Sequence, residues 1–553
     1  EMVVTGSLGK AGKNSKSLGQ YMTPMFVAKF MSSLISKPTT ARVLEPGAGE
    51  GVFLRILDKK GFENVTAYEI DTRLAKRSPA KISHGNFLEI PPKPTCDVII
   101  GNPPYVRWKN ILPEWRDIFK KSEYWNKIMN GLCDLSYAFI YHSVNLLRER
   151  GELIFICPLF WTETLHAGRL REHLSNNGSL ELLINLNEAK VFDKVASTIM
   201  IFKYLKRVKL PNVKIVEYRS KEPVTPQVMN KISLLIRRLE LQPSDSDFHF
   251  ENDVFRAYLT EQFVGGKPWH PIPPTAQVVK RLDAIEAVVQ LGDISEIGNG
   301  MVSGLDRAFR LEENPKVLNE HERSSLIYVY KAKTLERFFP SSDPIPYIFT
   351  NHIDSQDELK QFYPHFYRKL SDYREILEKR YNYKKDIPWW HWVFLRNKHL
   401  FEQHGIKIFV PSKERYDTRG YFRFALINDK EGKTCYATQD VTAICIKKHA
   451  TKEKIEYILG LLNSEPIQKW IVIKGFSRGG VHDFCEGPTS IIPIPKVDWD
   501  NPKEVELHRL IVEVVDEVLV QRRLNLTREL NDYVLKLLEH KKKAKTLRLD
   551  SFS

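Results

Sequence analysis

The residues best suited to chemistry are Asn102-Pro103-Pro104-Tyr105, which follow an apolar segment, residues 97–101, typical of a buried strand. Asn supplies an amide oxygen, and the Pro-Pro step restricts the backbone so that the carbonyl of Pro103 can point outward. Tyr105 adds a flat aromatic face. Two acceptors beside a ring suit a planar NH2 group on a conjugated system, because they draw its lone pair out of conjugation. The run therefore predicts catalysis on such an amine.

A glycine-containing loop, residues 43–54, supplies the second half of the predicted site. Gly47, Gly49 and Gly51 allow the backbone to approach a ligand closely. Glu45 stands at the loop entrance, where a carboxylate repels pyrophosphate but suits an ammonium or a sulfonium. A dinucleotide site is therefore disfavoured.

The next apolar strand ends in Glu69, which is placed to accept hydrogen bonds from both ribose hydroxyls of a nucleoside ligand. A glycine loop and a ribose-binding acid without phosphate-binding features predict S-adenosylmethionine as the cofactor. The alternative is a purely structural strand-turn-helix with surface acids.

These residues need a scaffold that brings strand ends together. Short apolar runs alternate with helical patterns such as 135–150, so we expect an α/β fold with a doubly wound, mostly parallel, Rossmann-like sheet. Ligands bind at the carboxyl ends of such strands. The predicted strands are residues 42–44, 65–70, 98–101, 152–157, 180–186 and 198–204.

Glycine and proline interrupt this pattern at residues 265–274. We therefore predict a first domain over residues 1–270 and a mixed α+β domain over 271–500, which a helix over 276–291 introduces. Apolar residues at helical spacing predict one or two terminal helices in a segment over 501–553, packed on their own chain.

Composition narrows the partners. The 553 residues carry a net charge of +15, which favours a polyanion, with a solubility surplus as the alternative. The sequence contains no run of 18 apolar residues, so no membrane span is expected. The N-terminal residues lack the apolar core of a secretory signal. Six scattered cysteines predict neither a disulfide framework nor a metal site, and they fit a cytoplasmic location.

In their order, these motifs resemble the γ-class amino DNA methyltransferases, the group that contains the TaqI adenine methyltransferase and the Eco57I-type enzymes. The resemblance covers Gly19 to about Tyr204 and continues loosely to about Ile494. It implies that residues 271–500 are a DNA-recognition domain. It also implies that Asn86 accepts from the cofactor adenine, where the family has Asp. The implied cofactor-binding residues are Thr23, Glu45, Pro46, Gly47, Ala48, Gly49, Gly51, Glu69, Ile70, Asn86, Phe87 and Asn102.

A later motif, Val191-Phe192 followed by residues 197–202, resembles the family segment whose Phe packs against a flipped target base. We expect Tyr105 and Phe192 to sandwich an adenine, with residues 102–105 as the catalytic motif. The implied activity is methylation of adenine N6 in double-stranded DNA by base flipping, within a restriction-modification system.

Two segments that mix basic residues with aromatic or glycine residues are candidates for base reading, residues 413–421 and 474–480. An exposed loop or hairpin is the alternative for each. Trp389, Trp390 and Trp392 are expected in the core. The candidate DNA-binding residues are Lys413, Arg415, Arg419 and Arg478.

Other activities remain open. A cytosine-N4 DNA methyltransferase performs the same chemistry, although such enzymes more often have Ser where this chain has Asn102. An RNA or protein-glutamine methyltransferase and a non-catalytic DNA specificity subunit are further alternatives. Because nothing in the chain resembles a nuclease centre, any cognate restriction endonuclease is expected to be a separate chain. The target sequence and the oligomeric state are not predicted.

Overall fold

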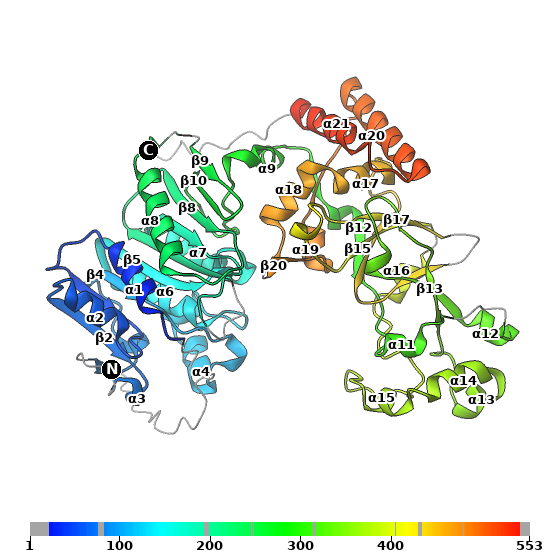
Figure 1. Cartoon of the computed structure of the whole chain (residues 1–553), viewed down its shortest axis with the longest axis horizontal. Coiled ribbons are helices and arrows are strands. Elements are labelled where there is room, and N and C mark those ends of the chain that lie inside the picture. Colours follow the sequence, from blue (N-terminus) through cyan, green and yellow to red (C-terminus); the bar gives the residue numbers. More distant parts are fainter. Residues whose placement is uncertain are drawn as a thin grey trace. The chain divides into compact units, whose positions relative to one another are not determined.

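The computed structural model describes residues 21–541, except 76–81, 193–197, 245, 247, 313–316, 404, 430–433 and 479 (Figure 1). Three residues of the predicted motifs, Gly19, Gln20 and Ser197, lie outside the described residues. The chain divides into two compact units, residues 1–275 and 276–553. None of the described helices has both the length and the apolar character needed to cross a membrane.

The first unit is built on a ten-stranded sheet of order β3-β2-β1-β4-β5-β7-β6-β8-β10-β9. From β3 to β5 all neighbours are parallel, and β7 is inserted antiparallel between β5 and β6. The predicted α/β fold is confirmed, and all six predicted strands are present. Its strands are β1 (Arg42–Glu45), β2 (Asn64–Glu69), β3 (Ser83–His84), β4 (Cys96–Gly101), β5 (Leu147–Pro158), β6 (Gly178–Asn185), β7 (Ile199–Lys206), β8 (Asn212–Tyr218), β9 (His249–Glu251) and β10 (Phe255–Glu261).

Helices cover both faces of this sheet, because alternate strand residues enter two separate cores. Val98 and Ile100 pack with α1, α2 and α8, whereas Ile99 packs with α4, α5, α6 and α7. The helices are α1 (Met25–Ser33), α2 (Val52–Lys59), α3 (Thr72–Ala75), α4 (Pro113–Lys121), α5 (Glu123–Asn126), α6 (Leu135–Leu146), α7 (Gly168–Asn177) and α8 (Pro226–Glu240).

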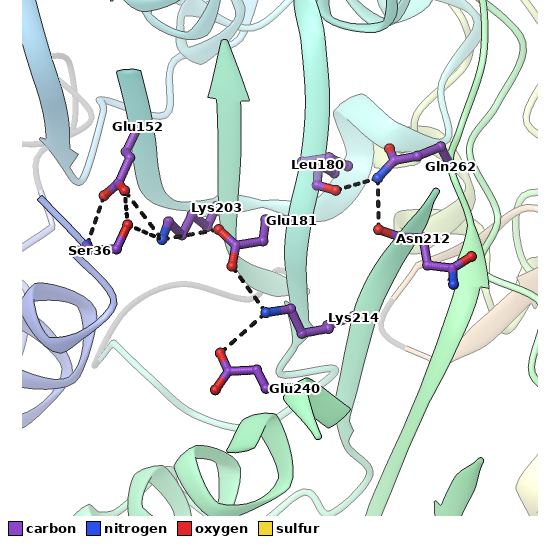
Figure 2. A network of polar contacts seen from close by, with 9 residues as sticks. All are labelled: Ser36, Glu152, Leu180, Glu181, Lys203, Asn212, Lys214, Glu240 and Gln262. Carbon is purple, nitrogen blue, oxygen red and sulfur yellow. Dashed lines mark hydrogen bonds and ion pairs between the residues drawn. The ribbon is translucent and has the colours of Figure 1, made fainter. Parts of the chain in front are cut away.

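A chain of charged side chains crosses the sheet within the α1/α8 layer (Figure 2). The Lys203 Nζ lies 3.0 Å from a Glu181 oxygen and 3.6 Å from a Glu152 oxygen, and Lys214 continues the chain to Glu181 and Glu240. A bulge in β6 makes Glu181 an extra residue opposite β7. Burial raises the pKa of Glu181, but the two lysines outweigh this effect and the pKa falls below its ordinary value.

Two predicted helices end early. The predicted helix over 135–150 stops at Leu146, because Leu147 is already extended and Arg150 has a positive φ. The helix predicted over 276–291 ends at Asp283 as α9 (Gln277–Asp283), and the β-branched Val288 and Val289 form a strand instead.

The second unit combines several small sheets with helices. Its strands are β11 (Val288–Gln290), β12 (Ser295–Asn299), β13 (Leu326–Tyr330), β14 (Ile345–Ile348), β15 (Ile406–Pro411), β16 (Lys413–Arg415), β17 (Ala425–Asn428), β18 (Cys435–Ala437), β19 (Val441–Ile446), β20 (Ser477–Arg478), β21 (Val481–Asp483) and β22 (Pro493–Pro495). Its other helices are α10 (Leu291–Ile294), α11 (Asp306–Phe309), α12 (Glu320–Ser324), α13 (Gln356–Phe362), α14 (Pro364–Ser371), α15 (Arg374–Lys379), α16 (Lys398–Glu402), α17 (Ile455–Asn463), α18 (Glu465–Lys474), α19 (Glu486–Ser490), α20 (Pro502–Gln521) and α21 (Thr527–His540).

The two terminal helices, α20 and α21, belong to this second unit. A Cβ placed on Gly460 of α17 would lie 3.0 Å from side-chain atoms of Ile511 and Val515, so α20 packs directly on α17. The predicted packing of these helices on their own chain is confirmed. Trp389, Trp390 and Trp392 lie in a buried cluster of the same unit, as predicted.

Candidate active site

The predicted site residues come together at one edge of the sheet. Strands β1, β2 and β4 are neighbours that run parallel, and they end at Glu45, Glu69 and Gly101. Parallel strands present their carboxyl ends at the same edge, where loops form ligand sites in doubly wound folds. The Asn102–Tyr105 motif and the glycine loop therefore lie side by side.

Both ends of the Asn102 amide are engaged. Its Nδ2 donates to the Tyr21 carbonyl at 2.9 Å and to the Thr23 Oγ1 at 3.1 Å, and its Oδ1 accepts from the Tyr105 hydroxyl. Because a backbone carbonyl can only accept, the Tyr21 oxygen dictates which end of the amide is the nitrogen. The acceptor Oδ1 is thereby held towards Tyr105.

The Tyr105 hydroxyl has one proton and two acceptors within reach. Besides Asn102 Oδ1, the Ile156 carbonyl at the end of β5 lies 3.0 Å away. Burial raises the pKa of Tyr105 well above its ordinary value, so the phenol remains a donor. The hydroxyl can therefore donate to the Ile156 carbonyl instead of Asn102 Oδ1 and still keep a hydrogen bond.

The aromatic rings at the site do not form an open slot between Tyr105 and Phe192. These two rings are 6.4 Å apart and inclined by 62°. Tyr21 contacts both, because its ring stacks on Tyr105 at 5.4 Å and 25° and lies 6.1 Å from Phe192. The side chain of Tyr21 therefore covers the face of Tyr105 that was predicted to receive a base.

The glycine loop is tied to the second strand through Glu69. The carboxylate accepts from the backbone N–H of Gly49 at 2.7 Å and of Asp71 at 2.9 Å. Gly49 and Gly51 have φ values of 53° and 76°, which residues with a Cβ rarely adopt. Burial raises the pKa of Glu69.

Glu45 is the least satisfied group of the site. Its side chain is 1% exposed, and its Oε2 has no hydrogen-bond partner among the described residues. Burial, followed by repulsion from Glu69, raises the pKa of Glu45 well above its ordinary value. A buried carboxylate oxygen without a donor is costly, so the pocket that Glu45 lines suits a cationic ligand group.

Two adjoining pockets surround these groups and share Tyr21, Met22, Gly47, Gly49 and Asn102. Of the predicted cofactor residues, the first is lined by Thr23, Glu45, Gly47, Ala48, Gly49 and Asn102. The second is lined by Pro46, Gly47, Gly49, Glu69, Ile70, Asn86, Phe87 and Asn102, and by Pro104 of the catalytic motif. Gly51, Pro103, Tyr105 and Phe192 are not among the described residues that line either pocket.

Asn86 and Phe87 line the second pocket. The Asn86 Oδ1 accepts from the Leu88 N–H at 3.0 Å and caps a short 3₁₀ helix, Phe87–Glu89. The ring of Phe87 is buried against Phe139 and His142, so the pocket reaches only part of it. Asn86 therefore keeps acceptor capacity while it also holds the local backbone.

Several lining residues were not predicted. Tyr21 lies inside the N-terminal motif, but only Thr23 had a predicted role there. The second pocket also has an apolar wall made of Ile111, Leu112, Trp115, Leu135 and Phe139. These residue types are ordinary core formers, and no sequence signal marks them as ligand contacts.

In the second unit, the two candidate base-reading segments meet in one small sheet of order β16-β21-β20. Arg415 and Arg478 both pair with Val481, one on each side of it. Lys413 is exposed at the start of β16, and Arg419 is exposed just beyond its end.

Glu414 holds this sheet from its buried face. Its carboxylate pairs with the Arg423 Nε at 2.5 Å and lies 3.6 Å from the Arg419 guanidinium. Arg423 also donates to the carbonyls of Ala332 and Leu335. These contacts anchor β16 and the segment after it, which carry the exposed residues Lys413 and Arg419.

Comparisons with known proteins show which proteins this chain is similar to. A family model described as Eco57I restriction-modification methylase matches residues 54–192. The type II methyltransferase M.HindII of Haemophilus influenzae is 38% identical over 521 residues, which cover 93% of this chain and 96% of M.HindII. M.HincII of Haemophilus influenzae is 36% identical with the same two shares.

Among solved structures, the type IIL restriction-modification enzyme MmeI, determined in complex with DNA, has a TM-score of 0.57 at 11% identity. The match covers 94% of this chain and 73% of MmeI, and at this identity it shows a shared fold. The predicted resemblance is confirmed, because the Eco57I model matches residues 54–192 and the two type II methyltransferases match nearly the whole chain. The chain belongs, with M.HindII and M.HincII, to the type II methyltransferases.

Proposed function

We propose that this protein uses S-adenosylmethionine to methylate N6 of an adenine in double-stranded DNA, as the methyltransferase of a type II restriction-modification system. The position of Asn102 carries the proposal. Its amide lines both pockets and donates to the Thr23 side chain, while its acceptor oxygen faces the ring cluster of Tyr21, Tyr105 and Phe192.

The donor set of the pockets fits this cofactor. Glu45 offers its unpartnered Oε2 to the ammonium and sulfonium end of the cofactor, and Glu69 lines the second pocket as an acceptor for ribose hydroxyls. Asn86 and the apolar wall with Trp115 and Phe139 suit its adenine. When bound, the cofactor supplies an electrophilic methyl group.

The chain's own contribution is to hold a planar amine with its lone pair free. Asn102 Oδ1 and the Pro103 carbonyl accept hydrogen bonds from its two N–H groups, and the Tyr105 hydroxyl turns its hydrogen bond to the Ile156 carbonyl, which releases Oδ1. The catalytic motif needs no strong base, because fixed acceptors and positioning supply most of the acceleration.

An adenine in a duplex is inaccessible to this site until it is flipped, at a cost of a few kcal/mol. Stacking on aromatic rings returns about 1–3 kcal/mol per base. Because Tyr21 already stacks on Tyr105, the incoming base must replace one ring contact with another. Phe192 then contacts the base as it now contacts Tyr21.

The experiment is to incubate the protein with radiolabelled S-adenosylmethionine and duplex DNA, and then to map the modified base by sequencing. Label at adenine N6 is the expected result, and label at cytosine N4 would correct the base. Label entering RNA or protein instead would refute DNA as the substrate. A cognate endonuclease on a separate chain would be detected as cleavage blocked at the methylated sites.

A further inference from the structure

Positive charge is concentrated in one short stretch of the second unit. Residues 368–398 contain nine Lys and Arg against four Asp and Glu, a net charge of +5 within a chain total of +15. The stretch includes α15 and the loop that follows it. Figure 1 shows α13, α14 and α15 at the end of the unit opposite to α20 and α21. None of the predicted DNA-binding residues lies in this stretch.

The loop after α15 has an unusual backbone. Tyr383 and Lys384 are consecutive residues with φ values of 56° and 60°, in the left-handed region. Residues with a side chain adopt this conformation at a cost, and such strain concentrates at functional sites. Asn382 supports it, because its side chain accepts from the N–H of Lys384 and its carbonyl accepts from the N–H of Lys385.

The loop is anchored at its base. Arg380 donates to the carbonyls of Ser303, Trp389 and His391. Phe394 is held by two backbone hydrogen bonds to Val302. The conformation is therefore fixed before any partner binds, which lowers the entropic cost of binding.

The anchored loop displays cations around aromatic rings. The Lys385 Nζ and the Arg396 guanidinium lie 5.2 and 5.1 Å from the centre of the Phe394 ring. Among the described residues, no carboxylate forms an ion pair with Lys384, Lys385 or Arg396. Tyr381 is 70% exposed, and its ring lies 4.8 Å from that of Tyr383.

We propose that residues 381–385 and Arg396 form a phosphate-binding site for duplex DNA, which rests on the proposed function. Lys384, Lys385 and Arg396 neutralise backbone phosphates, and the exposed ring of Tyr381 packs against the sugar-phosphate chain. Strong preorganisation favours this role over a solubility surplus, because cations that only aid solubility need no strained and anchored loop. Such contacts position the duplex and carry no sequence information.

The test measures the salt dependence of binding to a short fluorescent duplex. Each phosphate contact contributes about −0.9 to the slope of log K against log salt, so Lys384→Ala/Lys385→Ala should make this negative slope shallower by about 1.8. Affinity near 0.1 M salt should fall on the order of tenfold or more. The matched control is Lys448→Ala/Lys452→Ala, which removes the same charge from exposed positions of the same unit and should change neither quantity as much.

Three further variants separate binding from folding. Lys384→Gly removes the charge but adopts the left-handed conformation freely, so it should melt no lower than wild type and still bind more weakly. Tyr381→Ala should weaken binding without changing the salt slope, and Tyr381→Phe should restore it. Wild-type affinity and slope in Lys384→Ala/Lys385→Ala would overturn the inference.

The outcome is distinguishable from failure of the proposed function. If the wild-type protein methylates DNA while Lys384→Ala/Lys385→Ala binds DNA like the control Lys448→Ala/Lys452→Ala, only the phosphate site is refuted. If the wild-type protein transfers no methyl group to DNA, the proposed function is refuted, and the binding slopes still decide whether this loop contacts a duplex.

Discussion

Substitution of Asn102 separates two roles that the proposed function gives to one amide. In Asn102→Ala the acceptor for the target amine is lost, together with the donors to the Tyr21 carbonyl and Thr23. Loss of one preorganised acceptor or donor at a reacting centre costs about 10²–10³ in rate. Loss of the two donor bonds costs at most about 1–3 kcal/mol and should appear as weaker cofactor binding, because Thr23 lines the same pocket.

Asn102→Asp is the informative partner variant. It keeps an acceptor oxygen for the amine, but it places a carboxylate oxygen where Nδ2 now lies 2.9 Å from the Tyr21 carbonyl. Two acceptors then face each other, so cofactor binding should weaken by about 1–3 kcal/mol while the single-turnover rate at saturation falls less than in Asn102→Ala.

The assay is single-turnover methylation of DNA at saturating cofactor, with cofactor affinity from calorimetry and folding from thermal melting. A rate for Asn102→Ala within tenfold of wild type would refute the acceptor role. Equal rates for the Ala and Asp variants would refute it as well. Wild-type cofactor affinity in both variants would refute the positioning of the N-terminal motif by Asn102.

Three other perturbations have expected outcomes of defined sign. Because the pKa of Glu45 is raised, the protein without ligand keeps its full stability below pH 4.5, where Glu45 is protonated, and loses stability as pH rises through the raised pKa. Glu45→Gln should therefore melt at a higher temperature than wild type, by a margin that grows with pH. A margin that stays constant with pH in calorimetry would contradict this. Lys203→Met leaves buried carboxylates without their cation and should cost about 3–5 kcal/mol in urea unfolding, whereas Lys214→Met, at a more exposed pair, should cost clearly less. With 2-aminopurine at the mapped target base, Phe192→Ala should lower the fluorescence gain on binding, and Tyr21→Ala should raise it. The opposite result would count against replacement of the Tyr21 ring on Tyr105 by the flipped base.

The strand ends of the site were predictable because they depend on local pattern and one rule of topology. Apolar runs identified β1, β2 and β4, and parallel neighbours necessarily bring Glu45, Glu69 and Asn102 to one edge. Each of these residues also differs chemically from the apolar residues before it. Pattern and residue type together were therefore sufficient.

Contacts between distant segments were not predictable in the same way. Val288 and Val289 fit a helical pattern locally, but pairing with β22 makes them a strand. Arg415 and Arg478 belong to one sheet only because β21 lies between their strands. The position of the Tyr21 ring on Tyr105 likewise depends on tertiary packing, since nothing in residues 21–24 distinguishes a stacking ring from a core one.

The closed ring cluster has a consequence for which amines the protein can use. With Tyr21 on the face of Tyr105 and the Tyr105 hydroxyl on Asn102 Oδ1, a free nucleoside finds the stacking face covered and the Asn102 acceptor occupied. Opening both requires free energy that a small molecule, with no other contacts, does not bring. A long polymer can supply it from contacts elsewhere on the protein. For the proposed function, this arrangement would protect the methyl donor from abundant free adenine compounds and couple its consumption to engagement of the whole substrate.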